Sequence, residues 1–258
     1  MPAKSDDRSI TLRAFGIIEA VLAADRGLTV PDILNTAKLP KPSAYRILRL
    51  LEDAGLLVRD LDGRHYIAGP GLTRIAFATF AANAQRTPRM AILRGLADET
   101  SESCALAVLD GVDARYVERA DSRWPLRPDL PSGTRVPLHA TASGKLLLAH
   151  TLAAVRDALL ERLRFDRFTP RTYVDRQTLD RHLTSIRKDG YALDTEEWLS
   201  GVNAIAVPVS TKNGRVIAAL TIEAAAARCA PDALRAVLPN LRTAAERLGA
   251  LIAFTPDQ

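Results

Sequence analysis

Apolar residues recur at helical spacing over the first quarter of the chain. Residues 10–24 therefore predict an amphipathic helix that turns its apolar face to a core. That face carries Phe15, Ile18, Val21 and Leu22. Thr29 and Asp32 have the spacing of a capping box, in which a hydroxyl and a carboxylate satisfy free N–H groups at a helix start. A short second helix is expected to begin there.

A third helix is predicted between a break at residues 35–40 and Ala54. Pro42 suits its first turn, because the N–H group that proline lacks would have had no partner there. The core-facing positions are Ala44, Ile47, Leu48 and Leu51. The other positions form a polar face that points outward. That face carries Ser43, Tyr45, Arg46 and Arg49.

A hairpin is predicted after the third helix. Residues 57–59 and 65–67 flank the pair Asp62-Gly63, which favours a two-residue turn, with Arg64 at the tip. The order helix, turn, basic helix, hairpin is that of a winged helix-turn-helix, whose second helix enters the major groove of DNA. We place this domain at residues 10–68, after a flexible tail at residues 1–9.

Residues 69–87 are expected to link two domains through a helix. The pattern breaks at Gly69, Pro70 and Gly71 and then resumes at helical spacing. The repeating positions are Leu72, Ile75, Ala76, Thr79 and Phe80. Such a stripe could pack against its own chain or against a second copy.

Residues 88–254 are expected to form the second domain, in which helical and strand patterns alternate. Two pairs of strand-like segments are joined by Asp110-Gly111 and Asn213-Gly214, which are hairpin turn pairs. Helices are predicted at residues 88–100, from Thr141, at residues 175–188 and from Pro231. Hairpins with flanking helices indicate a layered α+β domain with one mainly antiparallel sheet, rather than a doubly wound parallel sheet.

The composition is that of an ordinary globular protein. Of 258 residues, 47% are hydrophobic and 25% are charged. No apolar run approaches the roughly 20 residues that span a bilayer, and the N-terminus lacks the apolar core of a signal peptide. A cytoplasmic protein without a membrane partner is therefore expected. Cys104 and Cys229 are expected to be buried, reduced thiols rather than a disulfide or a zinc site.

Positive charge is concentrated around the third helix. Between Lys38 and Arg49 there are four basic residues and no acid, although the net charge of the chain is only +5. DNA phosphates attract such a face, and Arg, Ser and Tyr near a helix start can hydrogen-bond to base edges. The alternative is a helical bundle with a solvated basic face.

The ordered combination of cap, turn, basic helix and hairpin favours DNA binding over that alternative. The residues expected to contact DNA are Thr29, Lys41, Ser43, Tyr45, Arg46, Arg49 and Arg64. A second basic cluster is expected to be solvated surface of a helix and a loop. Its members are Arg162, Arg164, Arg167 and Arg171.

The segment at residues 139–148, HATASGKLLL, superficially resembles two enzyme motifs. A phosphate loop would need Gly at His139 and Ser or Thr at Leu146, and a hydrolase elbow would need Gly at Thr141. No metal-binding or dinucleotide motif is present, so neither a metal nor a cofactor is expected. The histidines are too scattered for a metal cluster and are expected to be structural. They are His65, His139, His150 and His182.

Two features suggest a small-molecule site. First, a helix predicted after Leu138 would present free N–H groups near Ala142 and Ser143, where an anion could bind. The alternative is that a threonine merely caps this helix. Second, a group of acids lies where one strand ends and a buried strand begins, although a solvated acidic turn would look the same. These acids are Asp194, Glu196 and Glu197.

The chain resembles the isocitrate lyase regulator (IclR) family of bacterial transcription factors over nearly its whole length. The family's recognition helix and wing resemble LPKPSAYRILRLLEDAGLLVRDLDGRHYI. Its two ligand-domain signatures resemble VPLHATASGKLLLA and GYALDTEEWLSGVNAIAVPV. The resemblance implies a winged N-terminal domain and a C-terminal sensor domain of GAF-like fold. It also implies homodimers or homotetramers, and repression or activation that changes when a small metabolite binds.

The resemblance further implies an effector pocket. Its hydrophobic walls would be Leu126 and Val136, and its other residues would be Ala142, Ser143, Asp194, Val202, Ala204, Thr221 and Glu223. The chain departs from members that bind small keto acids, because Ala142 replaces a glycine and Glu223 replaces a small hydroxyl residue. An extra carboxylate disfavours a compact anion unless Glu223 points away or pairs with a base. Short organic acids, aromatic acids and larger or less charged compounds therefore stay open as effectors.

The favoured hypothesis is a homo-oligomeric regulator that binds a double-stranded DNA operator and responds to a small-molecule effector. Dimers that contact half-sites about 34 Å apart would lose affinity if an effector changed that spacing. The alternative is an enzyme or a metabolite-binding protein whose N-terminal domain serves only for assembly. An enzyme would need a catalytic set that the sequence lacks.

Overall fold

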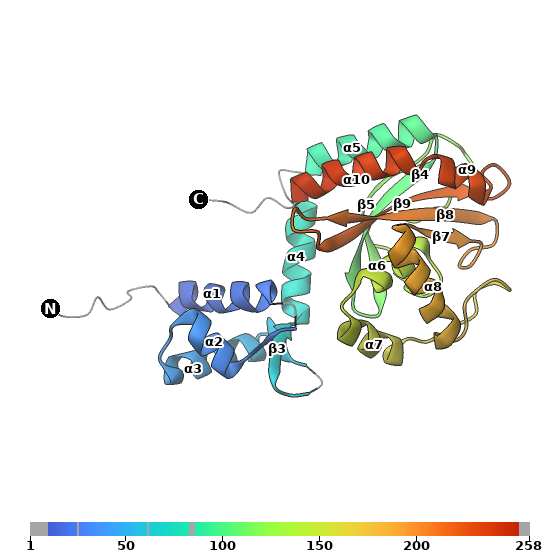
Figure 1. Ribbon diagram of the computed structural model, residues 1–258. Coiled ribbons are helices and arrows are strands. Elements are labelled where there is room, and N and C mark those ends of the chain that lie inside the picture. The colour runs from blue at the N-terminus through green and yellow to red at the C-terminus, as the bar shows by residue number, and fades with distance from the viewer. Residues whose placement is uncertain (1–9, 25, 61, 83–85, 253–258) are drawn as a thin grey trace. The chain divides into compact units, whose positions relative to one another are not determined.

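The protein is described here from a computed structural model (Figure 1), which covers residues 10–24, 26–60, 62–82 and 86–252. It divides into an N-terminal unit that ends at Ala81 and a C-terminal unit that begins at Ala82. Each unit has its own hydrophobic core. The flexible tail predicted at residues 1–9 lies outside the described residues.

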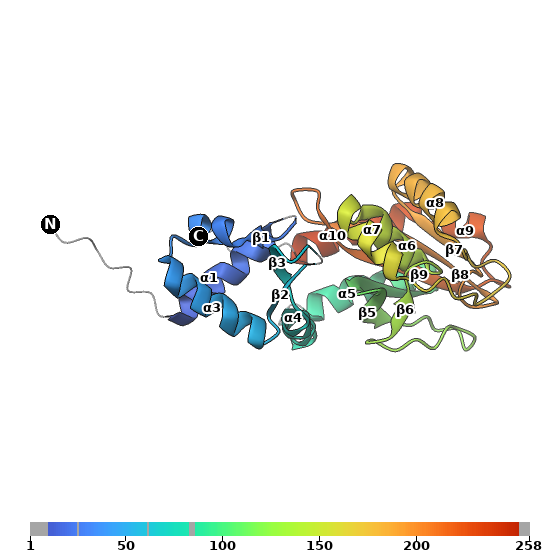
Figure 2. The same cartoon turned by 90° about the horizontal axis from the view of Figure 1, so that it is seen from below.

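The N-terminal unit is a small helical domain with a three-stranded antiparallel sheet in the order β1-β3-β2. Its helices are α1 (Ile10–Ala23), α2 (Val30–Ala37), α3 (Lys41–Asp53) and α4 (Pro70–Ala82). Its strands are β1 (Leu28–Thr29), β2 (Leu57–Arg59) and β3 (His65–Ala68). Figures 1 and 2 show α1, α2 and α3 packed together beside the sheet. This is a winged helix-turn-helix, as the sequence predicts.

The predicted core face of α1 is partly wrong. Ile17, Ile18 and Val21 are buried, whereas the side chains of Phe15 and Leu22 are 58% and 46% exposed. The helix carries apolar residues on more than one face, so periodicity alone could not select the face that meets the core. The apolar residues on its other faces lie on the surface.

The wing differs from the predicted two-residue turn. The β2–β3 ladder ends with Arg59 opposite Tyr66, and the connecting loop is longer than two residues. The Asp62 carboxylate accepts a hydrogen bond from the backbone N–H of Arg64 at 2.6 Å. Gly63 donates its backbone N–H to the Asp60 carbonyl at 3.0 Å. The Asp62-Gly63 pair therefore shapes a turn within a longer loop, because the aspartate side chain bonds to the backbone that follows it.

The C-terminal unit has a six-stranded antiparallel sheet in the order β6-β5-β4-β9-β8-β7. Its strands are β4 (Ser103–Asp110), β5 (Asp113–Ala120), β6 (Arg135–Pro137), β7 (Ala192–Thr195), β8 (Val202–Ser210) and β9 (Val216–Ala225). Its helices are α5 (Arg86–Thr100), α6 (Ala142–His150), α7 (Ala153–Arg162), α8 (Arg176–Asp189), α9 (Pro231–Ala236) and α10 (Leu238–Ile252). Helices α5 and α10 cover one face of the sheet, and α6 and α8 cover the other (Figure 1).

The layered α+β architecture and both predicted hairpins are confirmed. Four details differ from the prediction. Helix α5 begins at Arg86 rather than Pro88, and the closing helix is divided into α9 and α10. Strand β1 and helix α7 were not predicted, since two residues are too few for a pattern and α7 has little amphipathic character.

Helix α6 approaches the sheet closely because Gly144 has no side chain. A Cβ atom on Gly144 would lie 2.6–2.7 Å from backbone atoms of Leu138 and Pro137, which is closer than real Cβ atoms come to other atoms. Under the helix the sheet carries small side chains, including Ala105, Ala107 and Ala206. This packing brings the first turn of α6 onto the inner face of the sheet.

The described residues also bear on the expectations for the cysteines and for a membrane-spanning helix. Both cysteines are free thiols, and Cys104 is buried while Cys229 is half-buried. Burial raises the pKa of Cys104 to about 12, so it stays protonated at neutral pH. Among the described helices, none is both long enough and apolar enough to cross a membrane.

Candidate DNA interface and effector site

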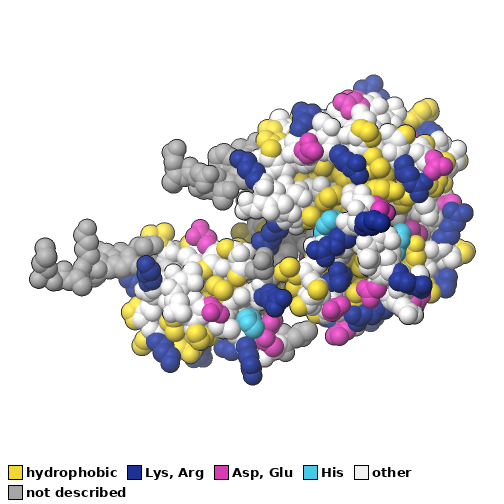
Figure 3. Space-filling model, viewed as in Figure 1, with side chains coloured by type: hydrophobic (Ala, Val, Ile, Leu, Met, Phe, Trp, Pro, Cys, Tyr) yellow, Lys and Arg dark blue, Asp and Glu magenta, His cyan; other side chains and the backbone are white. Residues whose placement is uncertain are grey.

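The exposed face of α3 carries the residues expected to meet DNA. Lys41, Tyr45, Arg46 and Arg49 are exposed, and Ser43 is half-buried. Among the described residues, neither Lys41 nor Arg46 has an ion-pair partner, and Arg49 lies 4.0 Å from Asp53 in an exposed pair. Figure 3 shows Lys and Arg side chains along the side of this unit that carries α3. The basic charge is therefore available to an external anion.

Thr29 has a structural task that competes with a DNA contact. Its hydroxyl accepts the backbone N–H of Asp32, and its own N–H donates to the Asp32 carboxylate at 3.1 Å, which confirms the predicted capping box. The hydroxyl hydrogen bond to Asp32, followed by the backbone bond, lowers the pKa of that carboxyl. Thr29 thus fixes the start of α2 beside α3.

The wing is tied to α3 by a polar cluster that the sequence did not indicate. Arg59 on β2 donates to the Tyr66 hydroxyl at 2.8 Å and to the Glu52 carboxylate at 3.2 Å. Its guanidinium lies 4.9 Å from the centre of the Tyr66 ring. Because Glu52 belongs to α3, this cluster sets the position of the wing, and with it the exposed side chain of Arg64, relative to the basic helix.

The sheet register gathers most of the predicted effector residues on one face. Ala204 on β8 lies opposite Asp194 on β7 and opposite Glu223 on β9. Thr221 and Val202 lie two residues further along their strands, so they point to the same side. Helix α6 packs on this face and brings Ala142 and Ser143 to it.

The start of α6 serves as a cap and also leaves a free polar group. The Thr141 hydroxyl accepts the backbone N–H of Gly144 at 3.1 Å and donates to the Pro137 carbonyl at 2.8 Å. Threonine capping, the alternative weighed from the sequence, is therefore present. Among the described residues, the hydroxyl of Ser143 makes no hydrogen bond of good geometry although the residue is 1% exposed, and it lies close enough to the Tyr116 hydroxyl to lower the pKa of that group. A buried hydroxyl without a partner is costly unless something binds it.

Glu223 pairs with a base, which is one of the two arrangements that would let the site accept a compact anion. Its carboxylate binds the Arg119 guanidinium and accepts the Tyr116 hydroxyl at 2.5 Å. All three residues are buried. Burial and then the charge of Glu223 raise the pKa of Tyr116 well above its usual value. The extra carboxylate is thus neutralised within the protein and does not by itself repel an anion.

A second buried cluster joins α6 to the loop after β7. Lys145 is fully buried and pairs with the Glu197 carboxylate, and its ammonium lies 5.0 Å from the centre of the Tyr173 ring. Burial raises the pKa of Glu197, and Lys145 opposes that effect. The sequence does contain one sign of this pair, the lone cation in the apolar run KLLLA, because a buried charge requires a partner.

Asp194 is 4% exposed and accepts the backbone N–H of Glu197 at 2.7 Å. Burial, followed by the nearby charge of Glu197, raises the pKa of Asp194 to about 8. The carboxyl is therefore mostly protonated at neutral pH and can donate a hydrogen bond. Together with the Ser143 hydroxyl, it gives this site hydrogen-bond donors rather than negative charge.

Only one of the two residues predicted to form hydrophobic walls of the effector pocket is buried. Val136 is 1% exposed within the core, whereas Leu126 is 69% exposed in the loop between β5 and β6. Leu126 therefore does not form a wall of a closed pocket in this structure. Residues 121–134 connect two strands by a long segment, whose side-chain packing cannot be predicted from hydrophobic periodicity.

The histidines are used mainly in structural contacts. His139 Nε2 lies 3.0 Å from the Asp166 carbonyl, and the His182 ring stacks on Tyr173 at 4.9 Å. His65 is the exception, because it and two acids of the wing place ligand atoms within 4.8 Å of one another. Those acids are Asp60 and Asp62. Hydrogen bonding between His65 and Asp62 at 2.7 Å accounts for the grouping without an ion.

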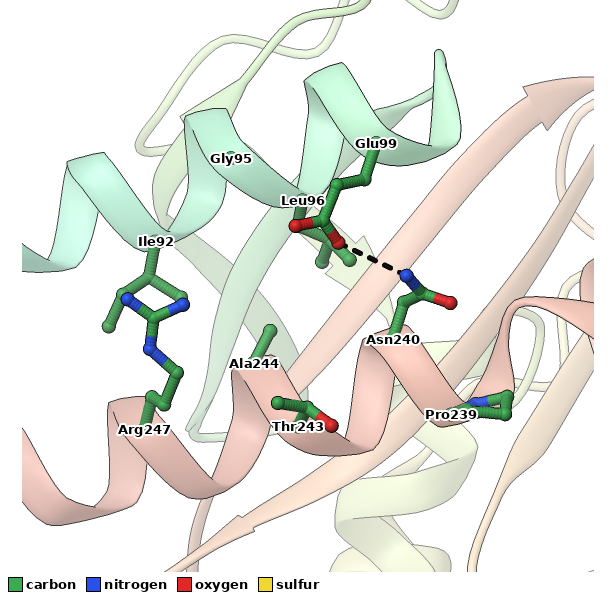
Figure 4. Close-up of a pocket in the computed structure, with 9 residues that line it drawn as sticks. All are labelled: Ile92, Gly95, Leu96, Glu99, Pro239, Asn240, Thr243, Ala244 and Arg247. Carbon is green, nitrogen blue, oxygen red and sulfur yellow. Dashed lines mark hydrogen bonds between the residues drawn. The ribbon is translucent and has the colours of Figure 1, made fainter.

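A groove of about 230 Å³ lies on the opposite side of the sheet from α6, between α5 and α10 (Figure 4). Glu99 and Asn240 form a hydrogen bond of 3.1 Å across one end, and Arg247 lies near Ile92 at the other end. Its location on the outer helical layer separates it from the predicted effector residues.

An exposed basic helix with a wing, followed by a domain whose buried face holds an unsatisfied hydroxyl and a protonated carboxyl, defines a DNA-binding regulator with a sensor domain. The chain belongs to the IclR family of bacterial transcriptional regulators. The family described as "Bacterial transcriptional regulator IclR C-terminal" matches residues 86–250, and the "IclR helix-turn-helix domain" matches residues 11–61.

Relatives and solved structures agree with this family. The "Probable transcriptional regulator SauR" of Cupriavidus necator is 36% identical over 92% of this chain and 94% of its own. An IclR homologue from Microbacterium hydrocarbonoxydans complexed with 4-hydroxybenzoate is 27% identical, with a TM-score of 0.60 over 96% of this chain and 100% of its own. A double mutant of the inducer-binding domain of the transcription factor PobR from Acinetobacter, in complex with 3-hydroxybenzoic acid, is 35% identical, with a TM-score of 0.57 over 63% of this chain and 96% of its own.

The relatives are named as regulators, so the chain is an IclR-type transcriptional regulator and not an enzyme. The alternative of an enzyme with an assembly domain is thereby set aside.

Proposed function

We propose that the protein binds operator DNA through α3 and the wing, and that a small carboxylic acid held between α6 and the sheet modulates this binding. The observation that carries the effector half of the proposal is that the layer between α6 and the sheet buries two groups able to donate, the Ser143 hydroxyl and the protonated Asp194 carboxyl. Both could donate to a carboxylate. The free N–H groups at the start of α6 add favourable partial charge.

The chemistry of the relatives' ligands supports an organic acid. One solved relative is complexed with 4-hydroxybenzoate and another with 3-hydroxybenzoic acid. Neutralisation of Glu223 by Arg119 removes the repulsion that the sequence suggested. The proposed effector contacts come from Val136, Ala142, Ser143, Asp194, Val202, Ala204, Thr221 and Glu223. Leu126 would contribute only if its loop closed over a bound ligand.

The proposed DNA contacts are divided between positioning and base recognition. Lys41 and Arg64 would contact phosphates, which set affinity and its dependence on salt. Ser43, Tyr45, Arg46 and Arg49 lie on α3 where side chains can reach base edges. Thr29 would act mainly by capping α2, with at most a backbone contact to phosphate.

We further propose that the protein acts as a homodimer or homotetramer in the cytoplasm, where its operator DNA is found. Several large exposed apolar side chains on α1, among them Phe15 and Leu22, support self-association, because a contiguous apolar patch on a surface is typical of a protein–protein contact. Two copies would present two basic helices to two half-sites.

The test is a fluorescence titration of the full chain on the DNA upstream of its own gene at about 50 and 200 mM salt. Arg46→Ala with Arg49→Ala should abolish sequence preference and keep most of the salt dependence, because that dependence comes from the phosphate contacts proposed for Lys41 and Arg64. The control is Arg187→Ala with Lys188→Ala, which removes two exposed charges from the last turn of α8. Equal loss in both double variants, or no sequence preference at either salt, would contradict the proposal.

The effector half is tested in the same titration with benzoate and short keto acids added. A binding acid should change operator affinity in the wild type, and Ser143→Val should abolish that change while leaving basal DNA binding intact. If the response survives Ser143→Val, the effector binds elsewhere and this half of the proposal is wrong.

A further inference from the structure

A second cleft in the C-terminal unit is not used by the proposed function. It has a volume of about 400 Å³ and lies between the edge strand β6, the segment after α7 and the loop after β7. Its lining residues include none of the residues proposed to contact the effector. Arg135 and Pro137 line the cleft, whereas Val136 between them is buried in the core.

One wall of the cleft is aromatic and remains partly open to solvent. Phe168 is 44% exposed, and Trp198 is half-buried. The His139 ring lies 5.7 Å from that of Phe168. His139 is 1% exposed, so its ring supports the wall from inside, and burial lowers its pKa. Such a wall suits a flat or apolar group.

The charged groups of the cleft include two cations and two anions without partners. Within the described part of the chain, Arg162 and Arg164 form no ion pair or side-chain hydrogen bond, and neither do the carboxylates of Asp113 and Asp166. The third arginine, Arg135, already has an ion-pair partner, since it binds the Asp110 carboxylate at 2.9 and 3.0 Å.

This balance of charge decides which ligand the cleft fits. A simple anion would meet two unpaired aspartates, and a simple cation would meet two unpaired arginines. A molecule that carries both charges can satisfy both pairs, and guanidinium groups bind carboxylates well. We propose that the cleft binds a free α-amino acid with a flat or apolar side chain. The carboxylate pairs with Arg162 and Arg164, the ammonium group with Asp113 and Asp166, and the side chain packs on Phe168 and Trp198.

Tryptophan fluorescence can report binding in the cleft, because Trp198 lines it. The chain has two tryptophans, Trp124 and Trp198, so Trp124→Phe leaves Trp198 as the only one. The probe is L-phenylalanine, which does not absorb where tryptophan is selectively excited. Two analogues each lack one charge, namely 3-phenylpropanoate without the ammonium group and 2-phenylethylamine without the carboxylate. We expect saturable change of Trp198 fluorescence with L-phenylalanine, and affinity at least about tenfold lower for each analogue.

Variants locate the binding. Arg162→Ala with Arg164→Ala should weaken L-phenylalanine binding at least about tenfold and should not weaken 2-phenylethylamine binding, because that analogue has no carboxylate for the two arginines to bind. Arg187→Ala with Lys188→Ala is again the matched control, and it should change neither affinity. Ser143→Val, at the candidate effector site, should also leave L-phenylalanine binding unchanged.

Several results would overturn the proposal. They are the absence of saturable binding, equal affinity for L-phenylalanine and 3-phenylpropanoate, equal loss in both double-charge variants, and loss of binding in Ser143→Val. The last result would assign the amino acid to the effector site. DNA is absent from the experiment, so its outcome is independent of the proposed operator binding.

Discussion

At the residue scale, burial sets the charge state of the candidate effector site. Asp194 is enclosed by the sheet, α6 and the Glu197 loop, and its folded pKa of about 8 lies far above the value of about 3.9 expected in an unfolded chain. Between these two values the folded protein binds more protons than the unfolded one. The free energy of unfolding should therefore fall as the pH rises from about 4 to 8, at up to about 1.4 kcal/mol per pH unit for this group.

Asp194→Asn should remove this slope and leave the site neutral at every pH. Urea denaturation followed by tryptophan fluorescence between about pH 5 and 8 measures it, because both tryptophans belong to the C-terminal unit. Asp232→Asn, at an exposed position in the first turn of α9, is the control. If the difference in unfolding free energy between wild type and Asp194→Asn is constant across this range, Asp194 is already ionised in the folded protein.

At the element scale, the DNA-binding surface depends on how helix starts are fixed. The capping box of Thr29 holds α2, and α2 packs against α1 and α3. Thr29→Ala should lower the free energy of unfolding of the N-terminal unit by about 1 kcal/mol, as expected for loss of a cap. Thr29→Ser keeps the hydroxyl and should keep most of this stability.

Hydrogen exchange at the backbone amides of α2 measures that loss directly. Operator affinity should follow stability in both variants if Thr29 acts by capping. A loss of affinity in Thr29→Ala with unchanged protection of α2 would instead indicate a direct contact between its hydroxyl and DNA.

At the scale of the whole molecule, the proposed self-association would bury exposed apolar side chains of the N-terminal unit. Phe15 on α1 is 58% exposed and Ile75 on α4 is 54% exposed. Phe15→Ser with Ile75→Ser should raise the dissociation constant of the oligomer at least about tenfold, since each removes a large apolar group from the interface.

Analytical ultracentrifugation over a concentration series measures this change. The control is Leu152→Ser, a 44% exposed leucine of the C-terminal unit. Operator affinity should fall together with self-association, because two linked DNA-binding domains are needed for two half-sites. An unchanged oligomer in the double variant would show that neither residue lies in the interface.

Much of the architecture follows from local patterns that can be recognised in the amino-acid sequence. The capping box, the outward polar face of α3 and the hairpins at Gly111 and Gly214 depend on residues that are near one another in the chain. Predictions failed where several faces or turns were locally acceptable, as for Phe15 on α1 and for the Asp62-Gly63 loop. On α1 the choice was made by packing against distant residues, and in the loop it was made by the hydrogen bonds of Asp60 and Asp62 to the nearby backbone.

The sequence by itself determined the winged domain, the α+β sensor domain and the place of basic charge, because periodicity, capping and turn chemistry act over a few residues. Only the tertiary structure decided that Glu223 meets Arg119, that Lys145 meets Glu197 and that Asp194 is neutral. These pairs join residues 52 to 104 positions apart, and the charge of Asp194 depends on burial. Pairing and burial are properties of three-dimensional packing, which no local pattern in the chain contains.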